Sequence, residues 1–196
     1  MVVVRIEGVR FSPSALNYWR ITWGLTVVII FITPLVRNYR KSDLSKLIKV
    51  YQSAFAEPPW NESWTPEEIK QDLNLAFSEK EPIVLVAEVD KTLAGFVWGY
   101  KLPLEKFSWL LGVIDGNVNY MDEIAVGGDR RIKGIGTRLG VEYLELVRRK
   151  NMTGVALRTD IWNSASMALF RKLGFQNTGI FDPKYKSRIY LYKELT

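Results

Sequence analysis

The sequence predicts a mixed α/β fold in which helices and strands pack in layers. From about residue 33 to the end, apolar runs of strand length alternate with amphipathic segments of helix length. The expected order is one strand, two helices, three strands, then helix, strand, helix and two strands, unlike the regular alternation of a doubly wound fold. At 196 residues and 47% apolar, the chain has enough apolar side chains to bury a full core.

The first 32 residues differ from the rest, and we expect them to form an extension to a domain at 33–196. Residues 1–11 have the composition of a short strand, and residues 21–36 are nearly all apolar. The β-branched residues in that run favour an extra buried strand, with a poorly ordered segment or a membrane anchor as alternatives. The 16 residues of the run are fewer than the roughly 20 that a membrane-spanning helix needs.

In the first half of the domain we expect a strand followed by two helices. The strand covers 35–39, and the first helix begins after Ser42, which is a good N-cap residue. Thr65-Pro66-Glu67-Glu68 predicts the start of the second helix. Thr and Glu at this spacing form a capping box, and Pro fits the first helical position.

A β-hairpin and then an alternation of strands and helices are expected in the remainder. Apolar runs at 83–89 and 93–100 flank a short polar turn and predict the hairpin. Residues 103–113 predict a short helix. The remaining strands and helices are expected, in the order given above, at 118–126, 135–150, 155–161, 165–173, 175–181 and 188–193.

The chain contains no cysteine and no histidine. Their absence excludes a disulfide framework, a thiolate nucleophile, a zinc finger, a histidine metal site and a Ser-His-Asp triad, and we expect no metal. An enzyme made from this chain must take its acid and base from carboxylates, tyrosine, lysine or bound water.

The net charge of +6 lies entirely in the second half of the chain. Residues 128–150 hold seven basic and three acidic side chains, whereas residues 57–90 hold nine acidic side chains and two lysines. This separation indicates an anionic ligand at one place and a cationic ligand at another, or simply two solvated helix faces.

A glycine-containing loop between a strand and a helix is a candidate phosphate site. The strand ends at Val126, and Gly134 and Gly136 lie where the next helix begins. Glycines let the backbone approach a ligand, and the first N–H groups of a helix suit phosphate oxygens, although the glycines could serve only a tight turn. The loop has neither the Gly-Lys-Ser/Thr of a Walker motif nor the third glycine of a dinucleotide fingerprint.

A second element follows the next strand, where Asn163 precedes a helix that exits through Gly174-Phe175. Together with Arg131-Ile132-Lys133-Gly134-Ile135-Gly136, this element resembles the two motifs of the GNAT superfamily of N-acetyltransferases. The resemblance covers about residues 35–194. It implies a central, twisted, mixed sheet of about seven strands flanked by about four helices, with the N-terminal residues as a β-rich or poorly ordered extension.

The resemblance also implies that acetyl-CoA binds between two splayed parallel strands. Backbone N–H groups from Ile132 to Thr137 would hold the pyrophosphate, and a strand end would pair with the pantetheine arm. Phe170 would line the thioester channel, and Asn163 would contact the pantetheine or the acceptor. The expected cofactor-binding residues are Ile124, Ala125, Val126, Arg131, Ile132, Lys133, Gly134, Ile135, Gly136, Thr137, Asn163 and Phe170.

Acetyl transfer to an amine needs a general base, because at neutral pH only about one primary amine in 2,500 is the free base. Glu123 and Asp122 are the candidates, with Glu123 preferred. Successive strand residues face opposite sides, so only one of them should face the cleft unless a bulge turns the chain. A backbone N–H near Val126 would stabilise the charge that develops on the acetyl oxygen.

One residue departs from the family pattern. Many members have a tyrosine where Phe170 stands, and its hydroxyl protonates the departing thiolate. Phe170 cannot do so, which leaves water, Tyr120, Tyr185 or Tyr190 as the proton source, or no dedicated acid.

The resemblance implies that the first two helices and the loop between them cover the acceptor cleft. Because this segment is rich in acidic residues, we expect a small cationic acceptor, such as a polyamine or an aminoglycoside-like molecule. Trp60, Glu62 and Trp64 are the expected contacts, through charge and cation–π attraction. Protein N-termini or lysines are alternative acceptors, and a non-catalytic acyl-CoA sensor is an alternative of another class. We expect a cytoplasmic protein, a possible homodimer, and no binding to nucleic acid, because the basic stretch lacks interleaved aromatic residues.

Overall fold

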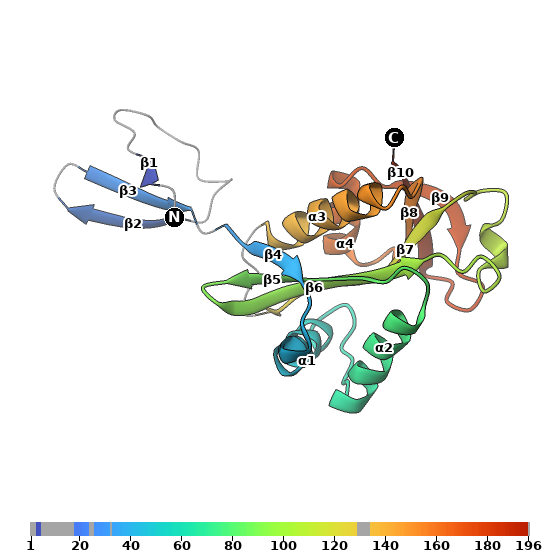
Figure 1. Cartoon of the computed structure of the whole chain (residues 1–196), viewed down its shortest axis with the longest axis horizontal. Coiled ribbons are helices and arrows are strands. Elements are labelled where there is room, and N and C mark those ends of the chain that lie inside the picture. The colour runs from blue at the N-terminus through green and yellow to red at the C-terminus, as the bar shows by residue number, and fades with distance from the viewer. Residues whose placement is uncertain (1–2, 5–17, 24–25, 32, 129–133, 196) are drawn as a thin grey trace.

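A computed structural model describes residues 3–4, 18–23, 26–31, 33–128 and 134–195 of the chain. Its centre is a seven-stranded sheet in the order β4-β5-β6-β7-β8-β10-β9 (Figure 1). All neighbouring strands are antiparallel except β7 and β8, which are parallel. This confirms the predicted mixed α/β fold. The strands are β4 (Leu35–Asn38), β5 (Ile83–Val89), β6 (Thr92–Lys101), β7 (Val118–Val126), β8 (Gly154–Asp160), β9 (Gln176–Phe181) and β10 (Arg188–Glu194).

In the described part of the chain, four α-helices cover the two faces of this sheet (Figure 1). Helices α1 (Leu44–Phe55) and α2 (Pro66–Ser78) pack on one face, and α3 (Ile135–Arg149) and α4 (Ser164–Lys172) pack on the other. Each face therefore has its own apolar core. The first core lies under α1 and α2 and includes Leu47, Tyr51, Phe96, Trp98, Tyr100 and Tyr120. The second lies under α3 and α4 and includes Met121, Leu139, Tyr143, Leu157 and Phe170.

The N-terminal extension is rich in β structure. Strands β1 (Val3–Val4), β2 (Tyr18–Trp23) and β3 (Thr26–Phe31) form a separate antiparallel sheet in the order β1-β3-β2. The apolar run at 21–36 therefore contributes to β2, β3 and β4. No helix within the described ranges is both long enough and apolar enough to cross a membrane.

Local hydrogen bonds explain why α2 and the hairpin form where the sequence predicts them. At the start of α2, the Glu68 N–H donates to Thr65 Oγ1 at 3.3 Å, and the Thr65 N–H donates to Glu68 Oε2 at 2.8 Å, which completes a capping box. Between β5 and β6, Asp90 and Lys91 both have positive φ, at 49° and 63°. Two such residues form the type I′ turn that suits the twist of a hairpin.

Two local predictions were wrong. Residues 103–113 form no α-helix, and only Ser108–Leu110 makes a 3₁₀ turn. Phe107 and Trp109 instead pack against Tyr120 and Tyr190, so tertiary contacts replace a helix too short to be stable alone. Ser42 lies within a 3₁₀ turn at Lys41–Asp43, and Asp43 takes the N-cap position of α1.

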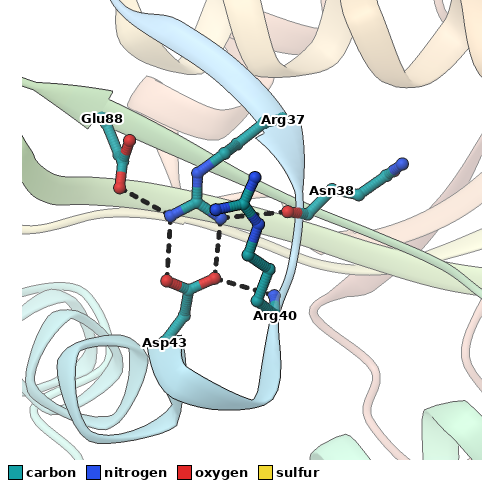
Figure 2. A network of polar contacts seen from close by, with 5 residues as sticks. All are labelled: Arg37, Asn38, Arg40, Asp43 and Glu88. Atoms are coloured by element: carbon teal, nitrogen blue, oxygen red, sulfur yellow. Dashed lines mark hydrogen bonds and ion pairs between the residues drawn. The ribbon is translucent and has the colours of Figure 1, made fainter.

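Arg37 on β4 ties together the edge of the sheet and the start of α1 (Figure 2). Its guanidinium donates to both oxygens of Asp43, at 2.7 and 2.9 Å, and to Glu88 on β5 at 2.6 Å. The Arg40 N–H also donates to Asp43, at 2.8 Å. The hydrogen bond from Arg37 is the main cause of the lowered pKa of Asp43 and of Glu88. The network therefore holds two carboxylates in their ionised form.

We expect Asp43→Asn to lower the free energy of unfolding at pH 7 by about 2 kcal/mol, because it removes charge-assisted hydrogen bonds from a buried site. A carboxyl whose pKa is lowered by folding stabilises the protein above its ordinary pKa, near 4, and loses that effect as the pH falls. The difference between wild type and variant should therefore shrink between about pH 5 and pH 3 in urea unfolding.

A matched control is Glu67→Gln, which removes a carboxylate whose ion pair with Lys70 is exposed to solvent. This variant should change the unfolding free energy by less than about 0.5 kcal/mol. If Asp43→Asn destabilises the protein equally at pH 7 and pH 3, the ion network is not the source of the effect.

Candidate active site

The parallel strands β7 and β8 separate halfway along their length. Four register pairs join them, from Val118 with Gly154 to Met121 with Leu157, and no pairing follows. Both strands continue beyond this point, to Val126 and Asp160. The unpaired segments therefore leave a gap in the middle of the sheet.

Backbone donors on β7 point into this gap. The Gly127 N–H, just after β7, donates to the carbonyl of Ala94 on β6 at 3.0 Å. Because N–H groups alternate between the two edges of a strand, those of Ile124 and Val126 point the other way, toward the gap. A ligand in the gap can thus pair with β7 as another strand would.

A cavity of about 800 Å³ opens at the gap. It is bounded by the end of β7, the starts of α3 and α4, and the loop after α1. Of the predicted cofactor-binding residues, those that line it are Ile124, Ala125, Val126, Gly134, Gly136, Thr137 and Asn163. Ile135 is buried beneath it, and Arg131, Ile132 and Lys133 lie outside the described residues.

The start of α3 presents its backbone to this cavity. Gly134 has a φ of 111°, a conformation that glycine adopts without strain, and it leaves the helix N-terminus open. The Arg138 N–H makes a hydrogen bond to the Gly134 carbonyl at 2.8 Å. The N–H groups of residues 135–137 come before this first helical bond, so they are available to an anion.

Asn163 and Phe170 both lie on the α4 side of the gap. Asn163 is buried, and its Oδ1 accepts the Ser166 N–H at 3.0 Å, so it caps α4 while lining the cavity. Phe170 lines a second, smaller cavity of about 50 Å³ and packs against Phe175. The two cavities adjoin, because Phe55, Trp60, Ile124 and Ser166 line both.

A β-bulge places both candidate bases on the same face. On β6, Trp98 pairs with Glu123 and the next residue, Gly99, pairs with Met121, so Asp122 is an extra residue on β7. Glu123 shares the α1 and α2 face with Trp98. In such a bulge, the extra residue need not follow the alternation of side chains between the two faces, so Asp122 can lie on the same side as Glu123. Both carboxylates line the smaller cavity.

The surroundings of these two carboxylates favour their neutral forms. Burial raises the pKa of Asp122 to about 6, and the charge of Asp72 on α2 adds to the shift. Burial also raises the pKa of Glu123 well above its ordinary value, with further contributions from Asp122 and Asp72. A carboxyl with a raised pKa is better matched to accepting and releasing a proton near neutral pH.

The three predicted acceptor contacts have different surroundings. Trp60 lines both cavities, and the Arg188 guanidinium lies 5.4 Å from the centre of its ring. The charge of Glu62 contributes to the raised pKa of Glu123. Trp64 donates its indole N–H to Glu62 at 2.9 Å and packs on Tyr51, so it supports the cleft wall and lines neither cavity.

None of the three tyrosines suggested as proton donors lines these two cavities. Tyr120 is buried in the first core. Tyr190 donates its hydroxyl to Asp182 at 2.9 Å, and burial together with this hydrogen bond raises its pKa to about 12. Tyr185 is exposed and stacks with Arg158 and Arg188.

The scan against family models provides the deciding comparison. The Acetyltransferase (GNAT) family model matches residues 46–175, which is more than half of the chain. The chain therefore belongs to the GNAT family. The matched region contains the end of β7, the start of α3 and the whole of α4, which are the elements that surround the gap.

Individual relatives of this GNAT chain are distant. A mycothiol acetyltransferase from Rhodococcus jostii is 26% identical over 144 residues, which is 72% of this chain and 45% of that protein. The chain thus spans less than half the length of this curated relative. Among the solved structures that share its fold is the PaiA N-acetyltransferase of Thermoplasma acidophilum in complex with coenzyme A. It has a TM-score of 0.62 and 19% sequence identity, and the match covers 84% of this chain and 100% of that one. A ribosomal-protein-alanine N-acetyltransferase of Brucella melitensis has a TM-score of 0.63 and 22% identity, and the match covers 82% of this chain and 99% of that one.

The GNAT site fits acetyl-CoA, the acyl donor of the family. The cavity between β7 and α4 is large enough for an extended arm, the N–H groups of Ile124 and Val126 face it, and the open start of α3 suits phosphate. In the described part of the chain, no three acidic side chains are grouped as ligands for a metal ion.

Sequence reasoning missed Arg158 and Asp182. Arg158 on β8 lines the smaller cavity with Asp122 and Glu123, and its Nη1 donates to Asp182 at 2.6 Å. An arginine inside a predicted strand is a detectable signal of a buried ion pair. Its partner is 24 residues away in sequence, however, and only the pairing of β8, β10 and β9 brings the two together.

Proposed function

We propose that this chain is an acetyl-CoA-dependent N-acetyltransferase that acetylates a primary amine of a small cationic molecule, such as a polyamine or an aminoglycoside-like compound. The proposal rests on the junction of the two cavities. Asp122 and Glu123 line the smaller cavity, and Ile124, the next residue on β7, lines both. The larger cavity would hold the CoA arm, and the smaller one would receive the amine.

Acetyl-CoA supplies an acetyl group activated as a thioester, which the amine nitrogen takes up with loss of the CoA thiol. Glu123 accepts a proton from the ammonium or from the attacking amine, directly or through a water molecule. The Val126 N–H, which points into the gap, stabilises the charge that develops on the acetyl oxygen. Phe170 has no proton to give, so the leaving sulfur is protonated by water.

Charge in the smaller cavity supports a cationic acceptor. Asp122 and Glu123 line it, and the charges of Asp72 and Glu62 act on the same carboxylates. Trp60 adds an aromatic face at the junction. Carboxylates and an indole together attract an ammonium ion by charge and by cation–π contact.

The test is release of CoA thiol from acetyl-CoA with a panel of amines. The panel holds a polyamine, an aminoglycoside, a neutral monoamine, an acidic amino acid, and peptides with a free N-terminus or a free lysine. We expect the polyamine or the aminoglycoside to give the highest kcat/KM. A preference for the peptides would identify a protein acetyltransferase, and CoA binding without turnover of any amine would identify a non-catalytic sensor.

A further inference from the structure

We propose that Arg158, held in place by Asp182, is a positioning residue that favours the ionised form of the general-base carboxylate on β7 against the effect of burial. The inference rests on the proposed role of Glu123 as that base. It adds a residue of β8, on the opposite side of the gap, to the residues proposed to take part in catalysis.

The register of the sheet places Arg158 across the gap from the two carboxylates. Met121 and Leu157 form the last parallel pair, so Asp122 and Arg158 are the next residues on the two separating strands. Arg158 pairs with Tyr190 on β10, and Tyr190 belongs to the first core. Arg158 therefore faces the same side of the sheet as Glu123.

Hydrogen bonds around Asp182 fix the position of the guanidinium. Asp182 is 3% exposed and accepts the Arg158 Nη1 at 2.6 Å, the Tyr190 hydroxyl at 2.9 Å, and the N–H groups of Lys184 and Tyr185 at 2.9 Å each. Burial alone would raise the pKa of Asp182, but these hydrogen bonds lower it to about 2. Asp182 thus stays ionised and anchors Arg158 through one of its N–H groups.

Arg158 has further N–H donors besides the one that Asp182 accepts, and it lines the smaller cavity. Its side chain is 28% exposed, and within the described residues Asp182 is its one hydrogen-bond partner. Among the described residues that line the smaller cavity, Arg158 is the only one with a cationic side chain. It therefore places a positive charge in the cavity that Asp122 and Glu123 line.

Removing that charge would leave the carboxylates facing one another. The titratable or charged groups around Asp122, Glu123 and Arg158 come from α1 and the loop after it, α2, β6, β7, α3, the loop between β9 and β10, and β10. They are Tyr51, Glu62, Asp72, Tyr100, Tyr120, Tyr143, Asp182, Tyr185, Arg188 and Tyr190. The guanidinium of Arg188 lies over the rings of Trp60 and Tyr185, and Arg188 does not line the smaller cavity. An opposite charge close to a carboxylate favours its ionised form, and within the smaller cavity Arg158 supplies one.

Two substitutions should shift the carboxylates in opposite directions. Arg158→Met removes the positive charge, so the carboxyls of Asp122 and Glu123 should titrate about one pH unit higher. Asp182→Asn leaves the guanidinium without its paired anion, so the same carboxyls should titrate lower than in wild type. Arg158→Lys keeps the charge and should restore most of the wild-type midpoint.

The experiment is a titration of the full chain labelled with ¹³C at the Asp and Glu carboxyls, followed by NMR, with Asp122→Asn and Glu123→Gln used to assign the signals. Arg148→Met, which removes a partly exposed arginine paired with Glu145 on α3, is the control for net charge. A shift in Arg158→Met that equals the shift in Arg148→Met would overturn the proposal, as would shifts of the same sign in Arg158→Met and Asp182→Asn.

The titration does not depend on turnover, so its result stays separate from the test of the proposed function. If acetyl transfer occurs, the acid limb of the kcat/KM profile should move with the NMR midpoints. An acid limb that stays in place while the midpoints move would show that Arg158 acts on carboxylates that do not serve as the base, and would overturn the proposal.

Discussion

Glu123→Gln should lower kcat/KM for acetyl transfer by about 10² to 10³, because a positioned general base contributes a factor of this size. The amide is nearly isosteric with the carboxylate but cannot accept the proton of the amine. Since Glu123 lines the smaller cavity and not the larger one, CoA should bind with unchanged affinity. Steady-state kinetics with the best amine of the panel, together with calorimetric titration of CoA, measure the two quantities.

The adjacent carboxylate provides the matched control. Asp122 lies in the same bulge and lines the same cavity as Glu123. Because Glu123 is the proposed base, Asp122→Asn should reduce kcat/KM less than Glu123→Gln does. A larger loss in Asp122→Asn would reassign the base to Asp122. Activity within about threefold of wild type in both variants would remove the carboxylate base from the mechanism, since the expected factor is far larger.

Gly136→Leu should weaken CoA binding by about 100-fold, or roughly 2.8 kcal/mol. Gly136 lies in the first turn of α3 and lines the larger cavity. A Cβ at this position would already contact Leu169 Cδ2 at 3.4 Å and Val126 Cγ2 at 3.8 Å. A larger side chain must therefore extend into the space that the ligand would occupy. Isothermal calorimetry with CoA measures the loss.

Gly136→Ala separates this steric effect from damage to the fold. Its Cβ makes only ordinary van der Waals contacts, so CoA affinity should stay within about fivefold of wild type. The thermal unfolding of ligand-free Gly136→Leu should also match that of Gly136→Ala. Tight CoA binding by the leucine variant would show that the ligand lies elsewhere.

Local sequence signals predicted most of the fold. The capping box at Thr65 and the turn at Asp90 and Lys91 placed α2 and the hairpin, because both motifs act through hydrogen bonds or backbone angles within a few residues. The segment at 103–113 was misassigned as a helix. Its conformation depends on Tyr120 and Tyr190, which come later in the chain and are not visible from local spacing.

The residues of the candidate site also fall into two groups: those that local sequence signals indicated and those that depend on contacts distant in sequence. Glycines and Asn163 indicated the larger cavity, since loop and cap residues carry their geometry in their own identities. The bulge at Asp122 depends on the register between β6 and β7, so the sequence could only state both alternatives for the two carboxylates. Arg158 and Asp182 became recognisable only through the strand order at the far edge of the sheet.

The separation of β7 and β8 has a consequence for stability. Only four register pairs join the two halves of the sheet. A ligand seated in the gap touches both halves and is absent from the unfolded chain, so it adds free energy to folding by mass action. At a free concentration 100 times its dissociation constant, the gain is about 2.7 kcal/mol. The free energy of unfolding would then rise with the concentration of the acyl carrier, so the incomplete sheet would couple the stability of the protein to that ligand.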